Sequence, residues 1–355
     1  MINFFSREYG PEKYMRYVGS TKQLFGLRAF KYFGGRSDGV LAADVRTGAG
    51  LRYTVMPGRG MDISEAEYKG IPLCYISGAG IVAPAFFEPE GDEWMRSFTA
   101  GMMTSCGIDQ VGTDCVVDGK RYPLHGRVSN LPAENVCMEE RFFDDIFKMS
   151  VRGTLSQVKP MDENLVLRRE ISSVAGKNEI LIEDEYENRS YSKSPFMILY
   201  HFNMGFPFLS ERTRFIVPYD AVESHYEGRE EKLKTVFTCE PPAERYPEDV
   251  FVFTMKPDKD GMCSALVIND GEKPELGLLI KFPFDVLPNL GLWKQFQEQD
   301  YVVGIEPCNN TIRGLEYASE NKELRYIEPL QKIKVSVVLS VIEGKELLSL
   351  IENME

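Results

Sequence analysis

The feature of this sequence that most restricts its fold is a repeated alternation of apolar and polar side chains in short segments bounded by Gly, Pro, Asn or Asp. The clearest segments are residues 51–56, 147–152, 180–186 and 333–339. This period of two is typical of half-buried β-strands joined by tight turns. Helical candidates are confined to residues 90–98 and 345–354. We therefore predict an all-β fold, a large antiparallel β-sandwich with few short helices.

The chain is expected to form one domain. Its 355 residues contain no Ser/Gly-rich or Pro-rich tract and no repeat of fixed period, and a large all-β chain can fill this length as a single body. We predict one domain over residues 1–355, with residues 1–38 as an N-terminal extension packed on it. No run approaches the roughly 18 apolar residues that span a bilayer, and the charged N-terminal segment does not resemble a signal peptide, so a cytoplasmic location is expected.

The charge balance argues against several classes of partner. The 41 Lys and Arg residues face 54 Asp and Glu residues, which gives a net charge of −13. This field repels nucleic acids and anionic lipid surfaces, so we expect neither as a partner. As a separate expectation, the protein is a monomer or homodimer. The seven cysteines are odd in number and include no C-x-x-C pair, which argues against a disulfide framework and a zinc ribbon.

The three histidines are candidate site residues because imidazole titrates close to neutral pH. His125 lies between a Pro and a Gly, at a predicted strand end or turn. If residues 199–204 form a strand, His201 and Asn203 share one face and aromatic side chains occupy the other. His225 lies in a polar stretch and is interpreted as an exposed loop residue. For His125 and His201, a buried structural imidazole is the alternative interpretation.

Glu306 is the candidate carboxylate. It follows an apolar run that is predicted to end at Pro307, because proline donates no ladder hydrogen bond. Apolar neighbours would raise the pKa of Glu306 and make it a proton acceptor near neutral pH, although a structural salt bridge is the alternative. Arg59 lies between two glycines and could present its donors to a hydroxyl, carboxylate or phosphate of a ligand. The glycine spacing is not that of a phosphate-binding loop.

The order of these elements resembles the aldose 1-epimerase (galactose mutarotase-like) superfamily, and most closely its divergent aldose-1-epimerase-like branch. The segments that carry the resemblance are the opening strands and Gly-rich hairpin at 39–77, Leu-His-Gly at 124–126, Tyr-His-Phe-Asn at 200–203, Gly-Ile-Glu-Pro at 304–307 and the closing strand at 329–341. The likeness covers about residue 20 to residue 342. The motifs are short, and their order and separation make the assignment specific.

The resemblance implies a galactose mutarotase-like supersandwich that binds a sugar on a concave face and interconverts its α and β anomers. It assigns His201 as the general acid and Glu306 as the general base. Anomerisation requires ring opening, which needs one proton donor and one acceptor but no metal or redox cofactor. We therefore expect a small-molecule carbohydrate as the partner and no cofactor.

The resemblance also suggests sugar-binding roles for Arg59, His125 and Asn203. Arg127 stands in a first motif that departs from the usual His-Gly-Gly pattern, and this change points to an acidic or phosphorylated sugar. Two other functions remain open. His125, His201 and Glu306 could form the ligand set of a metal-dependent sugar isomerase or epimerase. Alternatively, the concave face could belong to a carbohydrate-binding module that catalyses nothing.

Overall fold

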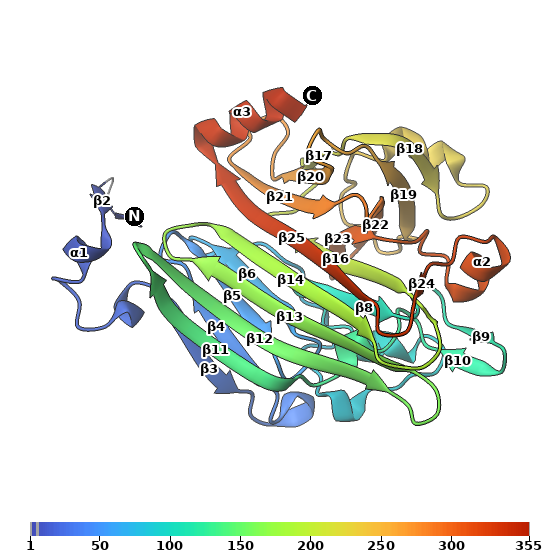
Figure 1. Cartoon of the computed structure of the whole chain (residues 1–355). Helices are drawn as coiled ribbons and strands as arrows, with labels where there is room; N and C mark the ends of the chain where they lie inside the picture. The colour runs from blue at the N-terminus through green and yellow to red at the C-terminus, as the bar shows by residue number, and fades with distance from the viewer. Residues whose placement is uncertain (1, 5–6, 355) are drawn as a thin grey trace.

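The computed structural model describes residues 2–4 and 7–354, and over these residues antiparallel sheets dominate the fold (Figure 1). The largest sheet has eight strands in the order β11-β12-β13-β14-β25-β21-β20-β17. Its strands are β11 (Glu134–Phe143), β12 (Ile146–Val158), β13 (Asn164–Val174), β14 (Glu179–Asn188), β25 (Lys332–Glu343), β21 (Leu276–Pro283), β20 (Met262–Ile268) and β17 (Arg214–Ile216). The prediction of an all-β antiparallel sandwich is confirmed.

Two further sheets complete the sandwich. The six-stranded sheet runs β18 (Tyr219–Ser224), β19 (Asp249–Met255), β22 (Asn289–Gln297), β23 (Asp300–Cys308), β16 (Met197–Gly205) and β8 (Thr104–Ile108). The five-stranded sheet runs β3 (Gly26–Lys31), β4 (Leu41–Arg46), β5 (Leu51–Met56), β6 (Asp62–Tyr68) and β7 (Ile71–Pro72). Strand β3 therefore brings part of the expected N-terminal extension into a sheet.

The remaining elements are short. Two-stranded pairs are β1 (Ile2–Phe4) with β2 (Arg7–Tyr9), β9 (Cys115–Val117) with β10 (Lys120–Tyr122), and β15 (Ser194–Pro195) with β24 (Tyr326–Ile327). The α-helices are α1 (Pro11–Tyr14), α2 (Leu315–Glu320) and α3 (Gly344–Met354). The 3₁₀ turns are η1 (Thr21–Gln23), η2 (Gly35–Ser37), η3 (Pro84–Phe86), η4 (Glu93–Ser97), η5 (Val128–Asn130) and η6 (Glu230–Thr235). No helix in the described ranges is long and apolar enough to cross a membrane.

The two predicted helices have different outcomes. The C-terminal prediction is confirmed by α3, which packs Leu347 and Ile351 against Leu266 and Ile268 of β20. The segment 90–98 is not an α-helix and contains only the 3₁₀ turn η4. The five residues of η4 are too few for a stable α-helix, and they form the shorter 3₁₀ turn that is common in connecting segments.

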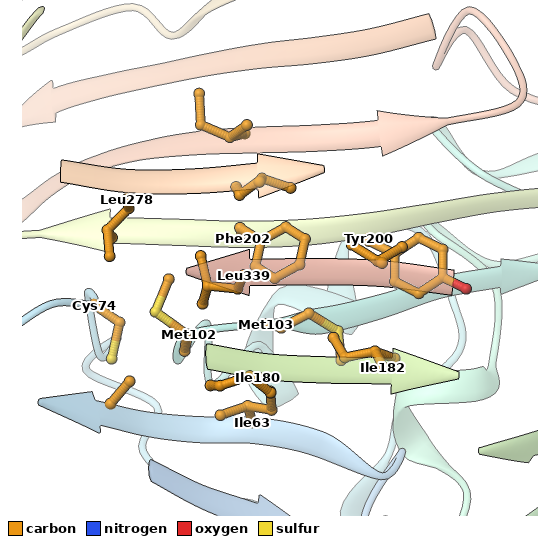
Figure 2. Close-up of a cluster of buried hydrophobic side chains, with 14 of the residues drawn as sticks. Ile63, Cys74, Met102, Met103, Ile180, Ile182, Tyr200, Phe202, Leu278 and Leu339 are labelled. Carbon is orange, nitrogen blue, oxygen red and sulfur yellow. The ribbon is translucent and has the colours of Figure 1, made fainter. Parts of the chain in front are cut away.

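The main core lies between the eight-stranded sheet and the other two sheets. Figure 2 shows Tyr200 and Phe202 of β16 in the same cluster as Ile180 and Ile182 of β14 and Leu339 of β25. Successive side chains of a strand point to opposite faces. The core face of β16 is thus aromatic, as predicted, and the intervening residue His201 points away from the core.

A buried ion pair lies on the core face of the eight-stranded sheet. Arg169 of β13 donates from Nε and Nη2 to the two carboxylate oxygens of Asp184 on β14, at 2.8 and 2.7 Å, and neither side chain is exposed. The Tyr200 hydroxyl donates to Asp184 at 2.6 Å, and Arg169 Nη1 donates to Ser105 Oγ of β8 at 2.5 Å. A buried charge pair is tolerated when each charge has such partners. The network joins β13 and β14 to the strands that carry the candidate site.

Candidate active site

A cavity of about 280 Å³ opens on the face of the six-stranded sheet that points away from the main core. Its floor consists of side chains from four adjacent strands: Val250 of β19, Trp293 of β22, Glu306 of β23 and His201 of β16. The loops above contribute walls that include Trp94, Phe98, His125, His225, Tyr226 and Glu248. The volume is just below the range of about 300–1,000 Å³ that is usual for small-molecule sites.

Strand register places His201 beside Glu306. The pairs Leu199–Cys308 and Phe202–Ile305 join β16 and β23, and the same register between them sets His201 directly opposite Glu306. Facing residues on antiparallel strands project to the same side of the sheet and come within contact distance. His201 Nε2 and Glu306 Oε1 are 3.1 Å apart.

Strand β23 does not end at the Glu-Pro step, contrary to the sequence-based prediction. It continues to Cys308, and Pro307 faces Leu290 of β22 within the ladder. The missing N–H of Pro307 coincides with the gap in the β16–β23 pairs opposite Tyr200. Proline therefore interrupts the ladder locally, and Glu306 projects from the middle of the sheet instead of from a strand end.

Two glycines make room for the Glu306 carboxylate. A Cβ added to Gly304 would lie 2.5 Å from Glu306 Oε1 and 2.9 Å from His201 Cε1. A Cβ added to Gly291 would lie 2.7 Å from Glu306 Oε2 and 2.4 Å from Ile312 Cδ1. These distances are below van der Waals contact, so any side chain at either position would displace the carboxylate. The Gly in the Gly-Ile-Glu-Pro motif thus has a steric function.

Burial sets the protonation of the pair. It raises the pKa of Glu306 to about 8, with a smaller contribution from the Glu248 carboxylate. Burial also lowers the pKa of His201 to about 3, with a further decrease from His125. Both groups prefer their neutral forms because charge is costly in a site shielded from water. These shifts favour a neutral pair at pH 7, in which Glu306 carries the proton.

Aromatic rings surround the two histidines. The Trp94 and Phe98 rings stack at 5.1 Å, Trp94 lies 5.1 Å from the His125 ring, and Phe98 lies 5.5 Å from the His201 ring. Trp293 lies 5.4 Å from the His201 ring and 6.3 Å from the Phe98 ring. We call Trp94 and Phe98 the aromatic wall. Burial lowers the pKa of His125 to about 4, so this imidazole is also neutral at pH 7.

The interpretation of His225 as an exposed loop residue is wrong. It is partly buried and lines the cavity, because its backbone N–H donates to Val250 O at 2.8 Å and continues the pairing of β18 with β19. Sequence reasoning also missed Glu248, whose Oε2 accepts a hydrogen bond from Trp293 Nε1 at 2.8 Å. One available signal was scarcity, since both tryptophans of the chain line this cavity.

The structure brings three of the six predicted site residues together: His125, His201 and Glu306 line the cavity. Arg59, Arg127 and Asn203 are absent from its lining among the described residues. Arg127 is partly exposed and precedes η5. Asn203 is fully buried and donates through Nδ2 to the backbone oxygen of His201 at 2.9 Å. Arg59 is also buried, and its fork points to Ser97 and Asn130.

The charges around the cavity do not favour an anionic ligand. Among the described residues of its lining there is no Lys or Arg, whereas there are two carboxyl groups, Glu248 and Glu306. The suggestion that Arg127 selects an acidic or phosphorylated sugar therefore has no support from this lining. No group of three or more His, Cys, Asp or Glu residues in the described ranges is arranged to hold a metal ion.

A larger hollow lies elsewhere and is not the candidate site. It measures about 760 Å³ on the outer face of the eight-stranded sheet, where Arg152, Arg168, Glu183 and Lys334 contribute to its lining. Much of that charge is already paired, as in the contact of Arg168 with Glu185 at 2.9 Å. None of the predicted site residues contributes to this hollow.

The fold of this chain is similar to that of several solved structures. The chain is similar to a protein from Klebsiella pneumoniae named as a "putative aldose 1-epimerase", with 26% identity, a TM-score of 0.88, and coverage of 94% of this chain and 89% of the other. It is also similar to a galactose mutarotase-like protein from Clostridium acetobutylicum, with 12% identity, a TM-score of 0.60, and coverage of 91% and 100%. A galactose 1-epimerase from Lactobacillus acidophilus aligns with 12% identity, a TM-score of 0.57, and coverage of 90% and 99%.

The two more distant likenesses concern the fold alone. No curated protein sequence matches the chain significantly. A family model described as "Domain of unknown function (DUF4432)" matches residues 37–341, which is most of the chain and includes His125, His201 and Glu306. The galactose mutarotase-like fold and this match agree with the resemblance seen in the sequence, and the chain belongs to the DUF4432 family.

Proposed function

We propose that this protein is an aldose 1-epimerase-like isomerase that interconverts the α and β anomers of a small sugar, with His201 and Glu306 as its proton-transfer pair. The observation that carries the proposal is the 3.1 Å contact between His201 Nε2 and Glu306 Oε1 on the floor of an aromatic cavity. The named activities of the structural relatives support the same reaction class.

The geometry of the pair suits ring opening. The two side chains are in contact with each other, so a sugar ring cannot lie between them. The sugar must therefore approach both groups from the same side. The reaction acts on the C1 hydroxyl oxygen and the ring oxygen, which are both bonded to C1. Adjacent oxygens can be served by adjacent side chains, one accepting the hydroxyl proton and the other donating to the ring oxygen. Rotation about the C1–C2 bond and closure with the roles reversed then give the other anomer.

The cavity offers polar atoms that a sugar could satisfy. Buried side-chain nitrogens without a hydrogen-bond partner among the described residues include Trp94 Nε1, His125 Nδ1, His201 Nδ1 and His225 Nδ1, and all four side chains line the cavity. Buried polar atoms are normally paired, so these atoms are available to the hydroxyl groups of a bound ligand. The flat aromatic rings can cover the C–H face of a pyranose while these atoms bind its hydroxyls.

The resemblance assigns His201 as acid and Glu306 as base, whereas the lowered pKa of His201 and the raised pKa of Glu306 favour a resting proton on Glu306. The two descriptions differ only in which member of the pair holds one proton. Because the roles reverse between opening and closure, a pair with one proton can work from either starting state. We therefore describe the active species as the singly protonated pair.

Anomer-exchange NMR is the test of this function. Saturation transfer between α and β anomer signals would be measured for a panel of neutral aldoses, amino sugars, uronic acids and sugar phosphates, with and without the protein. Faster exchange for at least one sugar supports the proposal. Tight binding of a sugar without faster exchange would instead indicate a carbohydrate-binding module, and exchange that depends on an added divalent metal would indicate the metal-dependent alternative.

The pH profile should show the loss of that single proton. The pair holds one proton between the pKa of His201, about 3, and that of Glu306, about 8. We expect kcat/KM, corrected for spontaneous mutarotation, to be flat from about pH 5 to 7 and to fall by about tenfold per unit above about pH 8, where no acid remains. Activity that rises steadily to about pH 9 would contradict this. A His225→Asn variant, which should keep the same descending limb, excludes titration of that neighbour as the cause.

A further inference from the structure

We infer that Arg59 is a positioning residue, which fixes the aromatic wall against His125 and His201 and does not bind the sugar. This inference rests on the proposed function. Arg59 lies in the turn between β5 and β6 and is 2% exposed. A buried guanidinium needs partners within the protein. Its Nη1 and Nη2 atoms have them, whereas Nε has no hydrogen-bond partner among the described residues.

The partners of Arg59 lie in two separate loops. Nη2 donates to the backbone oxygen of Ser97 and, at 3.2 Å, to Asn130 Oδ1. Ser97 is the last residue of η4 and precedes Phe98, and its hydroxyl donates back to the Trp94 oxygen at 3.0 Å. The Arg59 fork therefore holds the backbone of the short segment that carries both rings of the aromatic wall.

The other edge of the guanidinium faces the sheet. Arg59 Nη1 lies 4.0 Å from Asp62 Oδ2. Asp62 Oδ1 in turn accepts hydrogen bonds from the backbone N–H and the hydroxyl of Ser105 on β8, at 2.9 and 2.7 Å. Strand β8 pairs directly with β16, where Thr104 faces His201. Arg59 thus connects the aromatic wall to the strand beside the reacting histidine.

The two flanking glycines explain how the turn fits here. A Cβ at Gly58 would lie 2.4 Å from Leu41 N, and one at Gly60 would lie 2.6 Å from Asp62 Oδ2. Gly60 also has a φ of 66°, which other residues rarely adopt. The two glycines therefore allow the turn to pack closely around the buried Arg59 guanidinium. This packing explains the Gly-Arg-Gly sequence without a ligand-binding role for Arg59.

The connection between the aromatic wall and β8 requires a planar side chain with several donors. One guanidinium contacts Ser97 O, Asn130 and Asp62 from fixed directions, whereas a lysine ammonium is a single point at the end of a flexible chain. Loss of the fork should release η4 and move Trp94 and Phe98 relative to the imidazoles. Displacement of a catalytic group by about 1 Å can reduce a rate about 100-fold.

Two readouts test the inference. The first is anomerisation kinetics of Arg59→Met and Arg59→Lys in the otherwise native protein. The second is the emission of Trp94, measured in a Trp293→Phe background where it is the single tryptophan. We expect kcat/KM to fall by about 10- to 100-fold in Arg59→Met and less in Arg59→Lys, with a red-shifted Trp94 emission in both. Arg28→Met, at an exposed arginine of the same sheet, should change neither readout.

Three outcomes would overturn the inference. The first is an Arg59→Met protein with native kcat/KM and native Trp94 emission. The second is full recovery of both readouts in Arg59→Met/Asp62→Asn, since this would trace the defect to an unpaired Asp62 and not to the wall. The third is a raised KM with unchanged kcat and unchanged emission, the result expected of a direct sugar contact. If Arg59→Met does not fold, Arg59→Lys carries the same comparison. Absence of anomerisation in the wild type would refute the proposed function, while the Trp94 emission would still decide the role of Arg59.

Discussion

Glu306→Gln is expected to reduce anomerisation by about 10³-fold, because it removes one of the two proton carriers without changing the shape of the side chain. The amide cannot pass a proton to or from His201, whose Nε2 lies 3.1 Å from the carboxylate. The two glycines that accommodate the carboxylate fit the isosteric amide equally well. Exchange NMR with a sugar accepted by the wild type is the measurement, and activity within tenfold of wild type would remove Glu306 from the reaction.

The same substitution should make the protein more stable at neutral pH. Burial raises the pKa of Glu306 from 4.5 to about 8, so between these values the folded state binds a proton that the unfolded state has released. The free energy of unfolding therefore falls as pH rises through this window. At about 1.4 kcal/mol per unit, the cost at pH 7 is on the order of 3 kcal/mol. A neutral amide avoids this cost.

Denaturant unfolding of both proteins from about pH 4 to about pH 9 measures this effect. The two stabilities should agree near pH 4, diverge as pH rises and run parallel above about pH 8, and the Glu306→Gln protein should be the more stable one wherever they differ. Glu183→Gln is the matched control, because Glu183 is an exposed carboxylate of β14 outside the cavity. Its free energy of unfolding should stay within about 0.5 kcal/mol of the wild-type value across the same pH range. A Glu306→Gln protein less stable than wild type at pH 7 would contradict the buried, protonated carboxyl.

Asp184→Ala is expected to destabilise the fold by about 3–5 kcal/mol, because it leaves the Arg169 charge buried without its partner. Asp184 accepts two hydrogen bonds from Arg169 and one from the Tyr200 hydroxyl, and its side chain has no exposed surface. Urea unfolding at pH 7 is the measurement. Since this pair lies behind β16, the remaining folded protein should also show altered anomerisation.

The control for Asp184→Ala is Glu183→Ala. Glu183 is the preceding residue of β14 and points to the exposed face of the same sheet. Its loss should change the free energy of unfolding by less than about 0.5 kcal/mol, as for most surface substitutions. A loss below about 1 kcal/mol in Asp184→Ala would show that the sheets do not depend on this network for their packing.

Much of the fold could be predicted from local pattern. Alternation along a strand is a property of neighbouring residues, so it can be recognised without knowing the partner strand. For this reason the segment 51–56 matches β5, and the two faces of β16 were assigned correctly around His201. The Glu-Pro step was harder, because whether a proline ends a strand depends on which neighbour its missing N–H would have faced.

The sites of contact between distant segments could not be predicted in the same way. The Arg59 guanidinium donates hydrogen bonds to Ser97 and Asn130, which lie 38 and 71 residues further along the chain. His225 is drawn into the cavity by pairing of β18 with β19. Neither contact produces a periodic pattern in the sequence around Arg59 or His225. A polar residue in a polar stretch has the same local pattern whether it faces solvent or a cavity.

The sequence by itself determined that this chain forms antiparallel sheets, and it placed His201 and Asn203 on the side of their strand opposite the aromatic core, because side-chain direction in a strand follows from position alone. Only the tertiary structure decided which of those polar residues meet a partner. Strand register set His201 opposite Glu306, and loop packing set the aromatic wall above them. Register and loop packing depend on the free energy of the whole assembled core, which no short segment of the chain contains.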